Sequence, residues 1–371
     1  MILKGERMHS TIKNDDIRDV LKKHLDKMEK SQNSIAKAIG ITKGYMSKFF
    51  SGKEIAFWMV IETVREISPS EEKQLMKEYS KSGFDKKYIY SALEYYYTNQ
   101  MFNEIRYIID NYSSVAPDAC NAYRFALNFR ESFKPLEHQR ALNNLKAKTI
   151  EGKTLLEIFE SYVYYNIGKY DLSLYSIDRA KEFLKGINDP FLKKSFKARI
   201  DEILANTYLK QENNIEKARD SAMSLMKTGI SKSHVMTATY LLGLSYFFES
   251  YKKSLNYYKQ LLKLYEEFPE REEEVIQNKE EIAILQYYWC KKIDEDYNVT
   301  HFTQVLSEGS SLKLYYLDKS LRPYAYLFDG IREVRTDKIL LCLHFFSEQR
   351  DYFRANIPKI QLKKMDLDLT L

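Results

Sequence analysis

The stretch SQNSIAKAIGITKGYMSKFFSGK, residues 31–53, has a periodicity that predicts two short helices joined by a tight turn. Ser31 or Asn33 can cap the first helix, because side-chain oxygens of these residues accept hydrogen bonds from free backbone N–H groups. Gly40 supplies the turn, where a positive φ costs glycine nothing extra. The small Ala36, four residues before this glycine, lets the second helix cross closely, so the pattern indicates a helix-turn-helix.

The second of these helices has one apolar and one polar face. Met46, Phe49 and Phe50 form the face that we expect to be buried, and Thr42 is the expected N-cap. The outward side chains are polar or positively charged, and Gly44 allows close backbone approach, so they suit a DNA major groove and its phosphates. From this helix and its flanks we expect DNA contacts by Gln32, Asn33, Thr42, Lys43, Gly44, Tyr45, Ser47, Lys48 and Lys53.

Charge supports this interpretation over its alternative, an ordinary helical hairpin. Residues 1–53 contain 12 lysines and arginines against 6 aspartates and glutamates, an excess of 6. The whole chain has 58 against 52, also an excess of 6, so the remaining residues balance. All the excess positive charge therefore lies on the segment with the helix-turn-helix pattern, as phosphate attraction requires.

Composition predicts an all-α chain. The 371 residues include only 12 glycines and 7 prolines, which indicates helices with short connections. The three cysteines form no CxxC pair and are typical of buried thiols in a reducing cytoplasm. The N-terminus is too polar for a secretory signal, and the longest apolar run, 339–346, is too short to span a bilayer. We expect a soluble, intracellular protein with no membrane contact.

No arrangement of residues indicates an enzyme. Phosphate-binding, dinucleotide-binding, zinc-protease and nucleophile-elbow motifs are absent, and the six histidines are scattered without nearby metal-ligating partners. We therefore expect no catalytic residues, no metal and no cofactor.

Helical periodicity continues along the chain. Residues 17–28 and 55–67 complete an N-terminal bundle, and Ser68-Pro69 marks a compact helix start, where we place a domain boundary. Further helices are expected at 74–80, 88–98, 103–111, 120–133 and 135–145.

A repeated pattern then indicates tetratricopeptide-like hairpins. Second helices are expected to open at Tyr170, Ile215 and Tyr251, each with a small residue three positions later. Upstream of the last two, Leu-Ala-x-x-Tyr (204–208) and Leu-Gly-x-x-Tyr (242–246) match the first helix of such repeats, near their period of about 34 residues. Stacked hairpins of this type form a right-handed superhelix with a concave surface suited to extended peptides. Candidate contacts on first helices are Arg199, Asn206, Ser245 and Tyr246, although any one of them can equally be a solvated polar residue.

The C-terminal part differs in composition. Residues 269–281 are expected to form a charged surface helix with a solvated face, followed by helices at 324–329, 338–346 and 352–355. An apolar stripe in 360–371 either caps the last repeat or pairs with another subunit. The predicted domains are 1–68 for DNA binding, 69–320 for peptide binding and 321–371 for capping and dimerisation.

Short motifs give the chain a family resemblance. It resembles the peptide-pheromone receptors of Gram-positive bacteria and their phages, most closely the AimR-type arbitrium receptors of temperate Bacillus phages. The resemblance is most specific at residues 74–79, 91–95 and 101–110, weaker at 206–248, and scattered at 330–365.

The resemblance implies a homodimeric transcriptional regulator of the lysis–lysogeny decision. In the family, the protein binds operator DNA and drives a small regulatory RNA gene that favours lysis, and a short peptide of about six residues binds in the repeat concavity and weakens DNA binding. The C-terminal segment contributes to the dimer, which implies such a role here for Met365, Leu367, Leu369 and Leu371.

The resemblance also implies residues of the peptide site. Asn206 stands where the family has a peptide-binding asparagine, and Asp351 where it has an acidic contact. The pocket departs from its relatives elsewhere: Ser320 and Leu244 stand at asparagine positions, and Tyr90 and Ser233 at arginine positions. We therefore expect a different peptide, with Arg199 as a further contact. The alternative function is a repeat adaptor that regulates a signalling partner without binding DNA, which the charge excess of residues 1–53 argues against.

Overall fold

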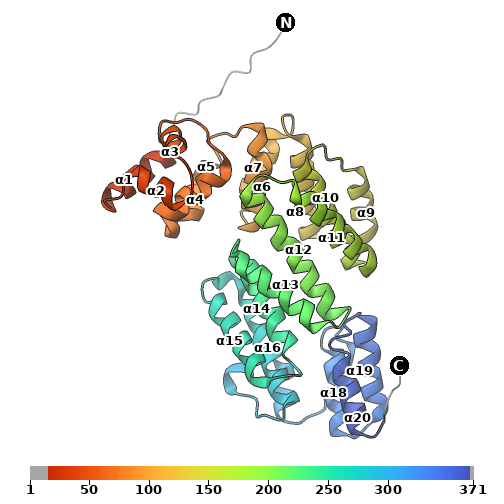
Figure 1. The fold of residues 1–371 in the computed structure, drawn as a ribbon. Coiled ribbons are helices and arrows are strands. Elements are labelled where there is room, and N and C mark those ends of the chain that lie inside the picture. Colours follow the sequence, from red (N-terminus) through yellow and green to blue (C-terminus); the bar gives the residue numbers. More distant parts are fainter. Residues whose placement is uncertain (1–15, 368–371) are drawn as a thin grey trace. The chain divides into compact units, whose positions relative to one another are not determined.

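The computed structural model describes residues 16–367, and within this range every regular element is a helix (Figure 1). The expected all-α fold is confirmed. No helix in the described range is long and apolar enough to cross a membrane. The chain divides into two compact units, the first reaching Leu127 and including Asn188–Leu192, and the second comprising the remainder.

The first unit begins with the helix-turn-helix. Its helices are α1 (Ile17–Lys27), α2 (Gln32–Ala38), α3 (Lys43–Phe50), α4 (Phe57–Ile67), α5 (Glu72–Tyr79), α6 (Ile89–Thr98), α7 (Phe102–Tyr112) and α8 (Pro117–Glu131), the last of which continues past the unit's end.

Local chemistry explains the bounds of α2 and α3. Ser31, rather than Asn33, caps α2 by accepting the N–H of Ser34 at 3.1 Å. Gly40 makes the predicted turn with φ of 75°, a conformation that glycine adopts without strain. Thr42 occupies the N-cap position of α3, but its side chain forms no capping hydrogen bond, so that part of the prediction is wrong.

The bundle shares its core with the helices that follow it. The ring of Phe57 on α4 lies 6.0 Å from Tyr79 on α5 and 5.9 Å from Tyr95 on α6, measured between centroids. The expected helix start at Ser68 is present as a 3₁₀ turn, Pro69–Glu71, in which the Ser68 hydroxyl donates to the Glu71 carboxylate at 2.7 Å. The functional boundary at residue 68 stays a prediction.

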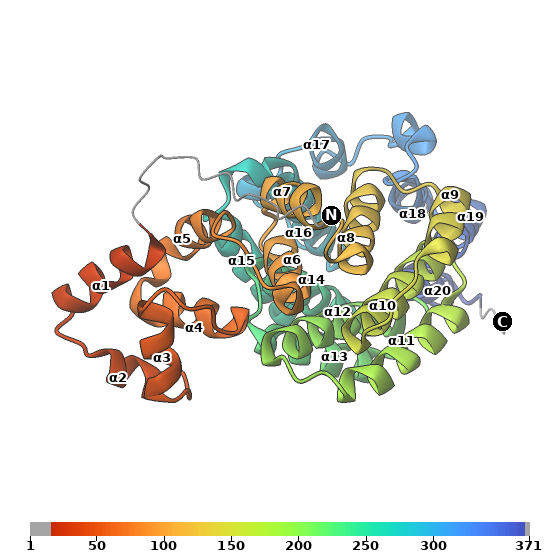
Figure 2. The same ribbon diagram turned by 90° about the horizontal axis from the view of Figure 1, so that it is seen from above.

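The second unit contains the helical hairpins. Its helices are α9 (Pro135–Asn144), α10 (Ile150–Asn166), α11 (Tyr170–Lys185), α12 (Pro190–Lys210), whose first turn belongs to the first unit, α13 (Ile215–Thr228), α14 (Lys232–Ser245), α15 (Tyr251–Tyr265), α16 (Glu272–Tyr288), α17 (His301–Ser307), α18 (Arg322–Arg332), α19 (Thr336–Glu348) and α20 (Asn356–Lys364). Figures 1 and 2 both show α10 and α11 side by side as one such hairpin.

Three second helices begin where the repeat pattern predicts, at Tyr170, Ile215 and Tyr251. The small residue three positions later is buried in each, because it lies against the preceding helix. In the α14–α15 hairpin, the Ser254 hydroxyl donates to the carbonyl of Gly243 at 2.8 Å. A Cβ on Gly243 would come within 2.9 Å of the Tyr258 ring, so this close helix crossing requires glycine.

The C-terminal part departs from the expected elements in two places. The 269–281 segment has the expected solvated face, but it opens with a 3₁₀ turn, and its other side places Asn278 in the interior at 3% exposure. Residues 352–355 form turns rather than a helix, and α20 begins immediately after them. In both places tertiary contacts remove a polar side chain from water, Asn278 in one and Arg354 in the other.

Candidate nucleic-acid interface and ligand pocket

Helix α3 presents its polar face to solvent because its apolar face is fully used in the core. Met46 and Phe49 are completely buried. On the opposite side lie exposed residues that were predicted to contact DNA: Lys43, Gly44, Tyr45, Ser47 and Lys48. Of the flanking predicted residues, Asn33, Thr42 and Lys53 are exposed and Gln32 is half-buried.

The lysines of this face are available to an anion. Within the described range, no carboxylate forms an ion pair with Lys43, Lys48 or Lys53. The ammonium of Lys48 lies 5.4 Å from the centroid of the Tyr45 ring, which positions both side chains on the outer surface. A row of exposed cations and hydroxyls on a short helix matches what a phosphate backbone and base edges require.

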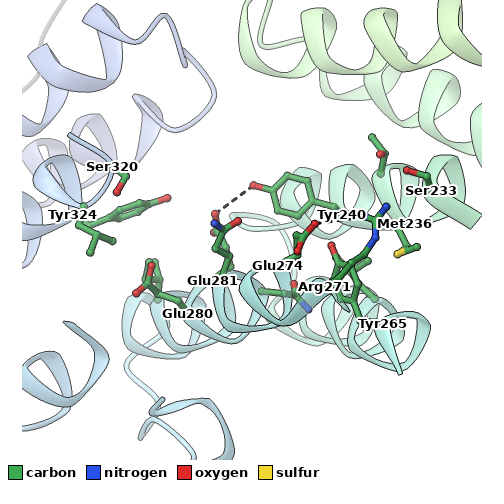
Figure 3. Close-up of a pocket in the computed structure, with 16 residues that line it drawn as sticks. Ser233, Met236, Tyr240, Tyr265, Arg271, Glu274, Glu280, Glu281, Ser320 and Tyr324 are labelled. Atoms are coloured by element: carbon green, nitrogen blue, oxygen red, sulfur yellow. Dashed lines mark hydrogen bonds and ion pairs between the residues drawn. The ribbon is translucent and has the colours of Figure 1, made fainter. Parts of the chain in front are cut away.

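The second unit contains a pocket of about 510 Å³ formed by α14, α15, α16 and the chain around residues 320–324 (Figure 3). This volume falls within the range of small-ligand sites. The lining residues are Ser233, Met236, Thr237, Tyr240, Leu261, Tyr265, Arg271, Glu274, Gln277, Asn278, Glu280, Glu281, Ile284, Ser320, Leu321 and Tyr324.

Three carboxylates and one guanidinium give this pocket an acidic lining. Arg271 lies 3.7 Å from Glu274, so these two charges largely offset each other. Glu280 accepts a hydrogen bond from the Thr300 hydroxyl at 2.8 Å. Burial raises the pKa of Glu280 above its ordinary value, with the neighbouring charge of Glu281 acting in the same direction and the hydrogen bond opposing it.

Arg354 joins three parts of the second unit beside the pocket. Its guanidinium donates to Glu281 of α16 at 2.6 Å and to the Tyr240 hydroxyl of α14 at 2.8 Å. It also pairs with Asp351 at 2.8 Å, three residues earlier. Burial opposes the charge, but the surrounding acidic groups, Glu281 first, hold the pKa of Arg354 well above its ordinary value.

Several buried polar atoms at the pocket have no protein partner. They are the hydroxyl of Tyr324, the carbonyl oxygen Oδ1 of Asn278 and the second carboxylate oxygen, Oε2, of Glu281. Buried polar groups are normally hydrogen-bonded, and an unmade bond costs about 1–3 kcal/mol. Three residues that line the pocket therefore each keep one polar atom without a hydrogen-bond partner in the protein.

The comparisons with known proteins agree with this architecture. The family model described as AimR transcriptional regulator-like matches residues 72–364. The chain belongs to this family. It is 23% identical to the AimR transcriptional regulator of Bacillus phage phi3T over 336 residues, which cover 84% of this chain and 87% of that protein. The AimR-type resemblance inferred from sequence is therefore confirmed, and the family is one of transcriptional regulators.

Two solved structures share the fold. The structure of SeMet-phAimR matches with a TM-score of 0.71 at 20% identity, covering 95% of this chain and 98% of that chain. The structure of phAimR with a ligand matches with a TM-score of 0.68 at 20% identity, covering 84% and 98% respectively.

The AimR-like fold places only some of the predicted peptide residues at the pocket. Ser233 and Ser320 line it. Asp351 is not among the lining residues and is paired with Arg354. Leu244 is 1% exposed in the hydrophobic core, where helix α14 turns it away from solvent, so its side chain is not presented to a ligand.

The other predicted peptide residues lie elsewhere. Asn206 and Arg199 are on α12 and do not line the pocket. Asn206 donates its amide to the carbonyl of Glu202 at 3.0 Å, and Arg199 is buried with its guanidinium 5.9 Å from the Phe159 ring. Tyr90 is half-buried on α6 in the first unit. Their roles stay predictions.

Sequence reasoning missed the acidic end of the pocket. Glu280, Glu281 and Arg354 were not predicted, because a charge-rich helix normally faces solvent. A signal was present: Asn278 and Glu281 stand in register with the apolar residues Ile282 and Leu285 and so share their buried side of α16.

The predicted dimerisation residues lie at the end of the described chain. Met365 follows α20 and is half-buried, and Leu367 is 43% exposed. Leu369 and Leu371 lie outside the described residues.

Proposed function

We propose that this AimR-family regulator binds operator DNA as a homodimer and that a short peptide, of about six residues, binds in the repeat domain and weakens DNA binding. The switch would act in the host bacterial cytoplasm and control the lysis–lysogeny decision of a phage. The proposed division of labour is residues 1–68 for DNA binding, 69–320 for the peptide and 321–371 for capping and dimerisation.

The unpaired cationic face of α3 carries the DNA-binding part of this proposal. Exposed lysines without carboxylate partners lose little by meeting phosphates and gain counterion release. The helix is supported by a fully buried apolar face, so its outer side chains are held in a defined register.

The pocket of the second unit supports the peptide part. The structure of a family relative has been solved with a ligand. The walls of the pocket combine aromatic side chains with polar atoms that have no protein partner. A switch of this kind requires the peptide to bind the DNA-incompetent state more tightly by the coupling free energy, typically about 1–3 kcal/mol.

A gel-shift on the intergenic DNA beside the gene, with and without hexapeptides encoded by the adjacent small open reading frame, tests the proposal. Light scattering of the same samples reports the dimer. DNA retention that a peptide reduces is the expected result. DNA retention that no peptide changes would contradict the switch, and an absence of DNA binding under low salt would instead support the adaptor alternative.

A further inference from the structure

The loop that joins α5 to α6 (Figure 1), residues 80–88, contains three lysines and one acidic residue. The acidic residue, Asp85, pairs with Lys87 at 3.1 Å, and the Lys87 ammonium lies 4.8 Å from the centroid of the Tyr88 ring. Lys81 and Lys86 are exposed, and no carboxylate in the described range forms an ion pair with either of them. The loop therefore carries cations that are available to an anion from outside the chain.

This loop is fixed against the segment that follows helix α3. Glu54, shortly after the end of α3, accepts the backbone N–H of Asp85 at 2.6 Å. The ring of Phe84, which is 9% exposed, lies 5.6 Å from the Phe57 ring between centroids, and the Phe84 N–H donates to the Tyr112 hydroxyl at 2.8 Å. The contacts come in opposite order along the two segments, so the segments run antiparallel where they meet.

The antiparallel arrangement places Lys86 beside the residues that follow the C-terminal end of α3. Lys53 directly precedes Glu54, and Lys86 directly follows Asp85. Both lysines therefore lie on the same side of the hydrogen bond that joins the two segments. The N–H of Lys53 donates to the carbonyl of Lys48, in the last turn of α3, at 2.9 Å. Exposed lysines thus continue from α3, across the turn that follows it, to the α5–α6 loop.

We propose that the DNA-binding surface extends from α3 to the α5–α6 loop, and that Lys86 contacts a phosphate of the operator backbone there. The inference rests on the proposed DNA-binding function and adds a contact outside the helix-turn-helix. Lysine side chains that lie together repel one another in the free protein, and a polyanion relieves that repulsion while it releases its own counterions. A phosphate contact of this kind positions the protein on the duplex without reading its sequence. The DNA-binding surface then extends beyond the boundary proposed at residue 68.

The salt dependence of operator binding by the full-length protein tests this contact. Fluorescence anisotropy of a labelled duplex from the intergenic DNA beside the gene gives the affinity at several salt concentrations. For Lys86→Ala, the slope of log affinity against log salt should fall by about 0.9, the value of one lost phosphate contact, and the affinity should drop severalfold. Lys86→Arg keeps the positive charge and should bind as the wild-type protein does.

Lys87→Ala is the matched control, because it removes the same charge from the adjacent position of the same loop. The Lys87 ammonium is already engaged by Asp85 and the Tyr88 ring, so the salt slope should stay close to that of wild type. Both lysines are exposed, so neither substitution should disturb folding, which thermal unfolding followed by circular dichroism checks.

The outcomes separate this inference from the proposed function. Salt-sensitive binding by wild type with an unchanged slope in Lys86→Ala would overturn the loop contact and leave DNA binding by α3 standing. Equal reductions of the slope in Lys86→Ala and Lys87→Ala would show that the loop acts only through its net charge, which also overturns a contact at Lys86. Absence of binding by wild type at low salt would overturn the DNA-binding function, and the loop contact with it.

Lysine footprinting measures the contact directly. The free protein and its complex with the operator duplex are treated briefly with an acetylating reagent, and the modified lysines are compared by mass spectrometry. Lys86 and Lys48 should both be protected severalfold in the complex, with Lys227 of the second unit, also exposed, as the reference. Protection of Lys48 without protection of Lys86 would contradict the extended surface, whereas protection of neither would contradict DNA binding by α3 as well.

Discussion

The helix-turn-helix and the pocket of the second unit use charge in opposite ways. On α3, the exposed lysines have no carboxylate partner among the described residues. The opposite side of the helix is buried and apolar, with Met46 and Phe49 in the core. Around the pocket, Glu281, Arg354 and Asp351 are drawn out of water and neutralise one another.

This difference separates recognition from stability. An exposed, unpaired cation contributes little to folding and is free to meet a ligand. A desolvated ion pair contributes to folding only as a set, because removing one member leaves a buried charge. Substitutions of the α3 lysines should therefore reduce DNA binding, whereas substitutions in the buried ion-pair network should reduce stability.

The largest expected effect is on the buried network. Arg354→Met leaves Glu281 and Asp351 without their cation and should lower the free energy of unfolding by about 3–5 kcal/mol. Urea unfolding of the second unit can be followed through Trp289 in a Trp58→Phe background, since these are the chain's two tryptophans. Arg335→Met is the matched control: its ion pair with Asp337 is more than half exposed and screened by water, so a much smaller loss of stability is expected. Equal losses of unfolding free energy in the two variants would show that the buried ion pairs contribute no more to stability than an exposed one.

An intermediate effect is expected for a residue of the predicted peptide site. Asn206→Ala should weaken peptide binding by about 1–3 kcal/mol if the amide meets the peptide backbone, as the family resemblance implies. Isothermal titration with a peptide recovered from the gel-shift screen measures it. Because the Asn206 amide donates only to the carbonyl of Glu202 in this structure, the substitution should change the free energy of unfolding much less than the peptide affinity. An unchanged affinity would remove Asn206 from the site.

The buried region should also respond to pH through His234. This side chain is 9% exposed and bonded to Ser231, and burial, reinforced by Arg199, lowers its pKa to about 4. The unfolded chain binds this proton near pH 6.5 and the folded chain does not, so the stabilisation is present above pH 6.5 and is lost as pH falls toward 4. The stability difference between wild type and His234→Gln should change by about 2–3 kcal/mol between pH 7 and 4.5.

Urea titrations at several pH values measure this difference. Above pH 7 the difference in unfolding free energy between the two proteins should stay constant, which provides the internal control. A difference that stays constant down to pH 4.5 would show that His234 does not titrate differently in the fold.

The smallest effect on stability is expected at the DNA-binding face. The double variant Lys43→Ala/Lys48→Ala should unfold within about 0.5 kcal/mol of wild type, because both side chains are exposed. Operator binding should weaken, and the slope of log affinity against log salt should fall by about 1.8, or 0.9 for each lost phosphate contact. Peptide affinity should be nearly unchanged. A salt slope equal to that of wild type would show that this face does not meet the DNA backbone.

Elements with strong local signals are predictable from the sequence. Gly40 marks the turn of the helix-turn-helix because only a residue tolerant of positive φ fits there without strain. The starts at Tyr170, Ile215 and Tyr251 follow from small residues at helical spacing, since neighbouring helices of a hairpin must approach closely there. The family resemblance rests on such short motifs and extends over most of the chain.

The acidic end of the pocket depends on contacts between residues that are far apart in the sequence. Tyr240, Glu281 and Arg354 are separated by tens of residues, and each taken alone is typical of a solvated helix or turn. The packing of α14 and α16 against the 351–355 turn removes them from water together, and this shared desolvation converts ordinary surface residues into one coupled network. Periodicity records which side of a helix is apolar, but not which distant partner makes a charge on that side tolerable.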